Sequence, residues 1–153
     1  MQVYAYDPFV DQKIIESFGG IKVNDLEEGL KDTDILSLSV PLTEQTYNMI
    51  NIEKMKIMKK NAIIINTSRG GIVNEKDLDE ALNKGFIYGA GLDVFEKEPL
   101  DTNNSLLKNK KVFLSPHSST FTEECTKRMG KETIQNIIDF FEDKLDQSKV
   151  VKL

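Results

Sequence analysis

The chain has 153 residues, 39% of them hydrophobic, which is enough for one domain with a single core. Its 25 acidic and 20 basic side chains give a formal net charge of −5, and because no stripe of Lys and Arg stands out, we expect no nucleic-acid partner. A single cysteine excludes an internal disulfide and favours a reducing cytoplasm, and the lack of an apolar leader or of a run of about 18 apolar residues argues against secretion and a membrane span.

Six short runs of β-branched and apolar residues predict buried strands. In chain order they are residues 3–6, 21–23, 35–40, 62–65, 87–92 and 112–114. The stretches between them have helical patterns over residues 10–18, 25–31, 52–59 and 75–83. Because strands and helices alternate, the sequence predicts an α/β fold with a doubly wound parallel sheet, and one compact unit is the simplest expectation.

Two helix starts carry capping signals. Asn74 precedes the fourth helical stretch with Asp77 three residues on, and Thr120 precedes a long C-terminal helix with Glu123 in capping-box spacing. Over the predicted residues 120–145, apolar side chains recur at helical intervals and form a stripe that needs a partner surface. The stripe consists of Met129, Ile134, Ile137, Ile138, Phe141 and Leu145.

Polar residues follow the ends of the first and third predicted strands. At the place of Asp7, a doubly wound nucleotide-binding fold puts an acid that accepts hydrogen bonds from the adenosine ribose. Its charge would repel a 2′-phosphate and so favours NAD over NADP; a purely local role of Asp7 and Pro8 in a turn is equally open. Residues 39–46 end a strand at Pro41 and add hydroxyls at the edge where ligands bind, or they form an ordinary strand stop.

The fourth predicted strand is followed by a candidate substrate-binding arginine, whereas the fifth contains two glycines. Arg69 follows a strand end and precedes paired glycines, which allow close backbone approach, so its guanidinium can grip a carboxylate through two hydrogen bonds. A surface arginine beside a glycine turn is the alternative. Gly89 and Gly91 resemble part of a phosphate-binding loop, but they lie inside a strand, where close backbone packing explains them better.

The only histidine, His117, follows the last predicted strand. Histidine exchanges protons near neutral pH, and a nearby carboxylate such as Glu98 would orient it and stabilise its charged form. The alternative is that His117 has only a structural role. Because the carboxyl ends of parallel strands share one edge of the sheet, Arg69, Glu98 and His117 are able to converge there.

Taken together, these segments resemble the D-isomer specific 2-hydroxyacid dehydrogenase family, which includes phosphoglycerate, lactate, glycerate and formate dehydrogenases. The resemblance covers nearly the whole chain, and Arg69 and Glu98 are separated by 29 residues as in the family. The other matching segments, in the family's order, are residues 40–43, 66–71, 91–95, 98–99 and 116–117. The resemblance implies a Rossmann-like fold and hydride transfer between a nicotinamide cofactor and a 2-keto acid.

The resemblance also implies a role for each site residue. Arg69 would bind and polarise the substrate's carboxylate and carbonyl, His117 would be the general acid/base, and Glu98 would partner it. Asp93 would contact the nicotinamide carboxamide and Asp7 the adenosine ribose. The NAD site would also be lined by Val40, Pro41, Thr67, Ser68, Arg69, His117 and Ser119. No metal is implied.

The chain departs from the family pattern at three places. Ser118 to Thr120 stand where the family has glycine or alanine soon after its histidine. The family's substrate domain is absent, and Met1 falls just ahead of the second strand, so the first strand and its G-x-G-x-x-G loop are lacking. We therefore interpret residues 1–153 as a partial NAD-binding domain, and we expect weak NAD affinity.

The missing strand belongs in the middle of the sheet, between the strands at Val3 and Ile35. We expect the gap to close by direct pairing of those strands, or through a second copy in a homodimer or strand-exchanged oligomer. Without a substrate domain to contact, the last helix should expose its stripe or bury it in an interface. The alternative function is a catalytically silent fragment that serves as an oligomerisation or nucleotide-sensing module.

Overall fold

The computed structural model describes residues 1–150 and divides the chain into two compact units, Met1–His117 and Ser118–Leu153. The single compact unit expected from the sequence is therefore wrong. Among the described residues, the hydrophobic core contains none beyond Leu114, and the long C-terminal helix buries none of its side chains.

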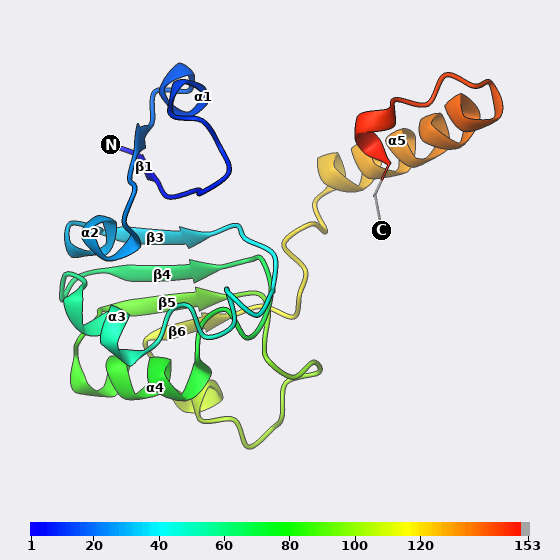
Figure 1. Ribbon diagram of the computed structural model, residues 1–153. Coiled ribbons are helices and arrows are strands. Elements are labelled where there is room, and N and C mark those ends of the chain that lie inside the picture. The colour runs from blue at the N-terminus through cyan, green and yellow to red at the C-terminus, as the bar shows by residue number, and fades with distance from the viewer. Residues whose placement is uncertain (151–153) are drawn as a thin grey trace. The chain divides into compact units, whose positions relative to one another are not determined.

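The first unit alternates strands and helices as predicted (Figure 1). Its elements are β1 (Tyr4–Ala5), α1 (Gln12–Ser17), β2 (Ile21–Lys22), α2 (Leu26–Lys31), β3 (Ile35–Leu38), α3 (Ile52–Ile57), β4 (Ile63–Asn66), α4 (Glu75–Lys84), β5 (Gly89–Leu92), the 3₁₀ helix η1 (Ser105–Lys108) and β6 (Val112–Leu114). All six predicted strands and four predicted helices are present, mostly shortened at their ends. The sequence did not predict η1, because a single 3₁₀ turn leaves no periodic pattern in a polar loop.

The strands form two parallel sheets, β1-β2 and β3-β4-β5-β6. This is the Rossmann-like order with no strand between β1 and β3. The expected direct pairing of those two strands is not what the chain adopts. β1 forms a two-residue ladder with β2 alone, and β3 pairs only with β4, so each keeps one edge unpaired in residues 1–150.

One face of the four-stranded sheet makes the core. Leu38, Ile64 and Leu92 point to this face and are at most 4% exposed; Leu38 and Leu92 are both in register with Asn66, two positions after Ile64. α3 and α4 lie side by side over it (Figure 1) and contribute Met55 and Leu78. The predicted start of α4 is confirmed, because the Asn74 side chain accepts the backbone N–H of Asp77.

The opposite face is only partly covered. Ile35 and Phe113 are 59% and 75% exposed, and Ile63 and Ile65 are half-buried. The expectation that every strand is buried therefore holds for one face only. Residues alternate between faces along a strand, and α3 and α4 cover a single side.

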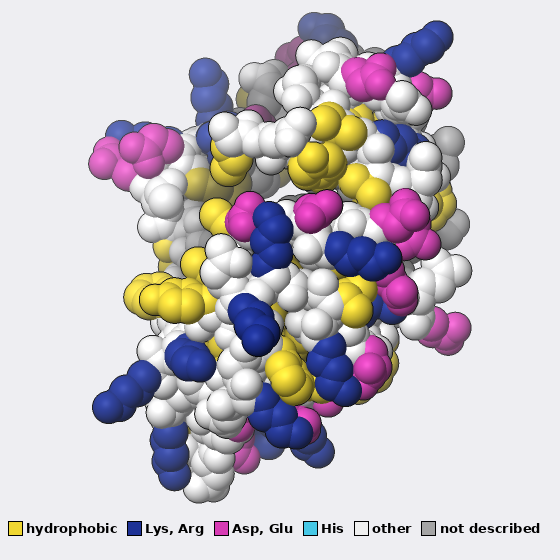
Figure 2. Space-filling model, turned by 90° about the vertical axis from the view of Figure 1, so that its left-hand side faces the viewer, with side chains coloured by type: hydrophobic (Ala, Val, Ile, Leu, Met, Phe, Trp, Pro, Cys, Tyr) yellow, Lys and Arg dark blue, Asp and Glu magenta, His cyan; other side chains and the backbone are white. Residues whose placement is uncertain are grey.

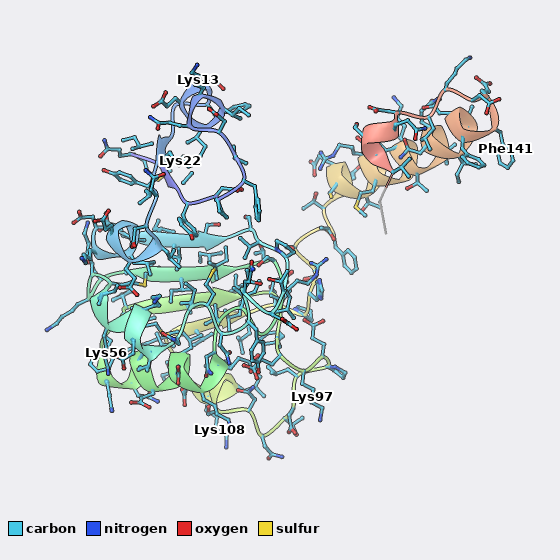
Figure 3. All side chains as sticks on the ribbon, in the orientation of Figure 1. Lys13, Lys22, Lys56, Lys97, Lys108 and Phe141 are labelled. Carbon is cyan, nitrogen blue, oxygen red and sulfur yellow. The ribbon has the colours of Figure 1, made fainter. Side chains whose placement is uncertain are left out.

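The second unit consists of α5 (Glu123–Phe141) and the 3₁₀ helix η2 (Gln147–Lys149). α5 is capped by Thr122, whose side chain accepts the N–H of Cys125, so the predicted cap at Thr120 is wrong. The N–H of Phe121 bonds the carbonyl of Ser118, and this turn delays the helix by two residues. The stripe residues on α5 are exposed, from Ile138 at 43% to Phe141 at 80%, and Phe141 is labelled in Figure 3. α5 ends at Phe141, so the predicted helix end at residue 145 is wrong, and Leu145 is half-buried beyond the helix.

Charges of both signs are interspersed over the molecular surface. Figure 2 shows lysines most densely on the lower part of one face, with acidic side chains among and above them. Within residues 1–150, no helix has the length and apolarity that crossing a membrane requires. No group of three or more His, Cys, Asp or Glu side chains in the same residues is placed to hold a metal ion.

Candidate active site

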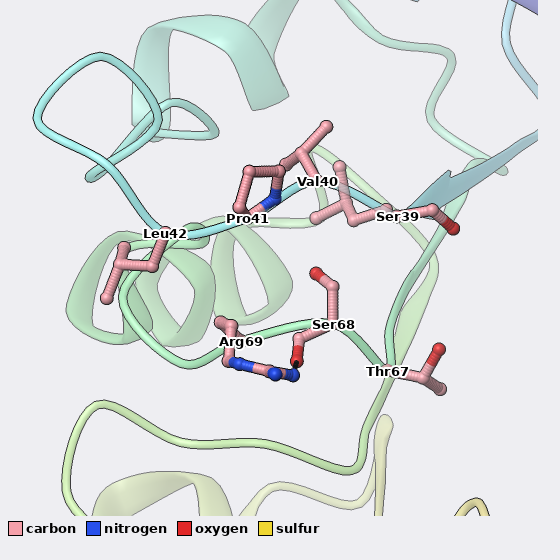
Figure 4. A pocket seen from close by; sticks show the side chains of 8 residues that line it. Ser39, Val40, Pro41, Leu42, Thr67, Ser68 and Arg69 are labelled. Atoms are coloured by element: carbon pink, nitrogen blue, oxygen red, sulfur yellow. Dashed lines mark hydrogen bonds between the residues drawn. The ribbon is translucent and has the colours of Figure 1, made fainter. Parts of the chain in front are cut away.

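The carboxyl ends of β3 and β4 enclose a cavity of about 680 Å³. Its walls come from the segment after β3 and the segment after β4, namely Leu38, Ser39, Val40, Pro41, Leu42, Thr67, Ser68 and Arg69 (Figure 4). Small-molecule sites in open α/β sheets occur at this edge, with volumes of roughly 300–1,000 Å³. Val40, Pro41, Thr67, Ser68 and Arg69 of the predicted cofactor set thus lie on one cavity.

The loop that carries Arg69 is fixed from below by Asn66, a buried polar residue at 2% exposure. The Asn66 amide nitrogen donates to the carbonyl of Arg69 at 2.9 Å, and its oxygen accepts from the N–H and the hydroxyl of Ser68 at 3.1 and 2.8 Å. Sequence reasoning did not assign this role. An asparagine between a buried strand and Thr-Ser is the signal for such a turn.

The side chains of this loop point in different directions. The Ser68 hydroxyl points across the cavity toward Pro41, whereas Thr67 points away (Figure 4). Arg69 is exposed, and its Nη1 donates to the carbonyl of Ser68 at 2.6 Å. The predicted close approach is at Gly70, where a Cβ atom would overlap the Phe95 carbonyl. The Arg69 loop therefore lies directly against the loop that follows β5.

The loop after β5 carries Glu98, which meets His117. The His117 Nδ1 and Glu98 Oε2 atoms are 2.7 Å apart, and Glu98 Oε1 accepts the N–H of Phe95 at 3.0 Å. These side chains remain accessible, with 50% of His117 and 37% of Glu98 exposed. His117 has a left-handed backbone with φ of 52°, a conformation that is uncommon outside glycine and concentrates at functional sites.

The hydrogen bond from His117, followed by that from the Phe95 amide, lowers the pKa of Glu98 below its ordinary value of 4.5. The folded protein thus favours the carboxylate form. The stabilisation that ionised Glu98 gives the folded state is complete above the pKa of Glu98 in the unfolded chain. It is lost as the pH falls through the lower pKa of Glu98 in the folded state. Solvent screens this contribution because Glu98 is more than one third exposed.

Glu98 and His117 line a second, mainly apolar cavity of about 340 Å³. Its other walls are Phe95, Pro99, Leu100, Leu107, Leu114, Ser115 and Pro116. The structure therefore brings together two members of the predicted trio, while Arg69 lines the first cavity. The convergence of all three around one hollow stays a prediction.

The remaining predicted residues lie outside both cavities. Asp7 Oδ1 accepts the N–H groups of Phe9 and Val10 at 2.8 and 3.1 Å, which is the local turn left open above. Asp93 is 2% exposed, and it accepts the Ser115 hydroxyl at 2.5 Å. Ser119 is exposed and belongs to the second unit.

Residues 1–119 match the model of the family described as "D-isomer specific 2-hydroxyacid dehydrogenase, NAD binding domain". The chain belongs to this family. A glyoxylate reductase from Korarchaeum cryptofilum is 43% identical over 140 residues, covering 92% of this chain and 42% of the relative. A D-3-phosphoglycerate dehydrogenase from Methanocaldococcus jannaschii is 43% identical over 90% of this chain and 26% of the relative. The chain thus spans less than half the length of these curated relatives.

Solved structures show the same fold. The D-lactate dehydrogenase of Aquifex aeolicus, complexed with NAD and lactic acid, superimposes with a TM-score of 0.78 at 32% identity, covering 94% of this chain and 47% of that one. A D-isomer specific 2-hydroxyacid dehydrogenase from Lactobacillus delbrueckii ssp. bulgaricus in its NAD-complexed form gives 0.82 at 31% identity, covering 98% and 48%. The Rossmann-like fold class predicted from the sequence is confirmed.

Proposed function

We propose that this chain forms the cofactor-binding and proton-transferring part of an NAD-dependent oxidoreductase that interconverts a 2-hydroxy acid and a 2-keto acid. The contact of 2.7 Å between His117 and Glu98 carries the proposal. An accessible imidazole oriented by a carboxylate at the ligand-binding edge of a parallel sheet is an arrangement suited to general acid/base catalysis. Membership of the family supports the same reaction class.

The residues of the first cavity fit NAD. Val40, Pro41 and Leu42 offer an apolar wall to a flat ring, and Ser68 and Arg69 supply polar donors beside it. When bound, this cofactor supplies or accepts the hydride. Asp7, after β1, is proposed to accept hydrogen bonds from the adenosine ribose through the oxygen that does not cap the local turn, and the buried Asp93 to face the nicotinamide carboxamide.

Each remaining site residue has a chemical task in the proposal. Arg69 holds the carboxylate of the substrate, because its exposed guanidinium can donate two parallel hydrogen bonds to one carboxylate. His117 gives its proton to the keto oxygen during reduction and takes it back during oxidation. Glu98 fixes the orientation of the imidazole and stabilises its charged form. Ser119 belongs to the proposed cofactor-binding set.

A titration of the chain with NADH, followed by fluorescence and then by addition of glyoxylate as a small 2-keto acid, tests the proposal. We expect weak binding of NADH and consumption of NADH that depends on glyoxylate. NADPH serves as the control and should bind less well, because Asp7 repels a 2′-phosphate. The proposal would be refuted if the chain showed no binding and no turnover at millimolar NADH. Assembly upon nucleotide binding without turnover would instead favour a silent oligomerisation or nucleotide-sensing module.

We further propose a homodimer or strand-exchanged oligomer, in which a second copy covers the unpaired edges of β1 and β3. Light scattering after size exclusion is expected to give twice 17.4 kDa at micromolar concentration. A cooperatively melting species of 17.4 kDa at every concentration would contradict the dimer.

The domain assignment remains part of the proposal. Residues 1–153 would be a partial NAD-binding domain, of which residues 151–153 lie outside the described part. The exposed stripe on α5, in the predicted helix region 120–145, is the surface proposed to meet the family's substrate domain. The lone Cys125 is consistent with a cytoplasmic location.

A further inference from the structure

One side of α4 is bonded to the long loop that follows β5. Glu75 Oε1 accepts the N–H of Glu96 at 2.6 Å, and Glu75 Oε2 accepts the side-chain amide of Asn104 at 2.8 Å. One turn further along the helix, Asp79 accepts the side-chain amide of Asn109 at 2.8 Å. Residues four positions apart share a helix face, so Glu75 holds the loop between β5 and η1, and Asp79 holds the segment between η1 and β6.

The fold explains why an acid at the start of α4 reaches this loop. A helix between two parallel strands runs back across the sheet, so α4 begins at the carboxyl edge where β5 ends. Glu75 is its first residue. Between β5 and η1 the chain has no regular secondary structure, so individual side-chain bonds determine its path.

A short series of bonds connects Glu75 to the imidazole. Glu75 fixes the backbone N–H of Glu96, and the N–H of the preceding residue, Phe95, fixes Glu98 Oε1. The other oxygen of Glu98 contacts His117. The second bond of Glu75, to Asn104, fixes the far side of the same loop, and Asn104 in turn caps η1 by accepting the N–H of Leu106.

From this geometry we infer that Glu75 is a positioning residue, which holds the loop after β5 in the shape that brings the Glu98 carboxylate to His117. The inference rests on the proposed function, because it assigns Glu75 to the same acid/base pair. The competing explanation is that Glu75 only stabilises the N-terminus of α4 through the helix dipole. That role would affect stability without moving Glu98.

Two substitutions of Glu75 and one matched control separate these explanations. Glu75→Ala removes both acceptors, while Glu75→Gln keeps one oxygen for the Glu96 N–H but opposes the Asn104 amide with a second amide. Asp79→Ala is the control, because it removes the same kind of bond between a carboxylate and an asparagine. Asp79 lies one helical turn after Glu75 and does not bond to Glu96. NMR of the 153-residue chain follows the backbone signals of Phe95 and Glu96 and the titration of the Glu98 carboxyl carbon.

We expect Glu75→Ala to shift both amide signals and to raise the pKa of Glu98 toward 4.5, because Glu98 loses its ordered contacts with Phe95 and His117. Glu75→Gln should restore the parent behaviour in part, and Asp79→Ala should leave Glu98 unchanged. An unaltered Glu98 titration in folded Glu75→Ala would overturn the inference, as would an equal change in Asp79→Ala.

Turnover provides a second readout. Glu75→Ala should lower kcat by roughly 10- to 100-fold, the size of effect that follows from a displaced catalytic group, with KM for NADH unchanged. A rise in KM for NADH at constant kcat would contradict a role in positioning. If the parent chain shows no turnover, the proposed function fails, but the NMR comparison still decides whether Glu75 positions Glu98.

Discussion

Gly70→Ala is expected to lower the free energy of unfolding by about 3 kcal/mol, the upper end of the usual cost of overpacking. A Cβ atom at this position would overlap the carbonyl of Phe95 and press on the N–H of Glu96. Both neighbours are backbone atoms, so no rotamer change relieves the overlap. The entropy that alanine removes from the unfolded chain returns only about 0.4–1 kcal/mol.

Urea unfolding of Gly70→Ala beside the parent measures this loss. Gly130→Ala is the control, because its Cβ atom meets nothing within 4 Å inside α5, and helix propensity predicts a gain of up to about 1 kcal/mol. If Gly70→Ala unfolds at the urea concentration of the parent, the Arg69 loop does not touch the Phe95 loop. The structure's placement of the Arg69 loop against the loop that carries Glu98 would then be wrong.

The strands and most helices were predictable because their signals are local. The run of isoleucines in β4 and the β-branched and apolar residues in the other strands mark chain that one or both faces of a sheet will bury. Helices between such runs force a parallel order, since consecutive parallel strands need a crossover. Asn74 was recognisable as a cap because its partner, Asp77, is three residues away.

Features that depend on distant partners were not predictable. The division at His117 was not predictable, because the amphipathic pattern of α5 does not reveal whether its stripe is buried. The choice of Thr122 over Thr120 as cap depends on a turn whose geometry neither threonine encodes. Glu75 acts through a loop, and its bond to Asn104 spans 29 positions. The side chain of Asn66, by contrast, bonds to Ser68 and Arg69, so its turn has a local signal in the sequence.

The candidate site falls between these cases. The strand pattern places Arg69, Glu98 and His117 after strand ends, and the structure adds the contact of Glu98 with His117. The distance of Arg69 from that pair depends on two loops, from 67 to 71 and from 93 to 104, which have no regular structure. Loop conformation depends on contacts such as the one at Gly70, and these are not encoded in the strand pattern.

His117→Gln should reduce the turnover of a 2-keto acid by roughly 10²- to 10⁴-fold, the range of general acid/base catalysis. Glutamine can still donate a hydrogen bond to Glu98, but it cannot release a proton to the substrate, so the loop should keep its shape while the chemical step fails. Binding of NADH, measured by fluorescence, should change little. Glu80→Gln, on an exposed ion pair with Lys84, is the control and should keep the parent rate.

The pH dependence distinguishes this mechanism from a merely structural histidine. Protonation of Glu98 removes the carboxylate from His117, so turnover should decline as the pH falls through the pKa of Glu98, which lies below 4.5. Activity therefore persists to lower pH than an ordinary glutamate would allow, and Glu98→Gln should remove this acid limb. If His117→Gln keeps more than about a tenth of the parent turnover, an effect smaller than the range for acid/base groups, the proton comes from elsewhere.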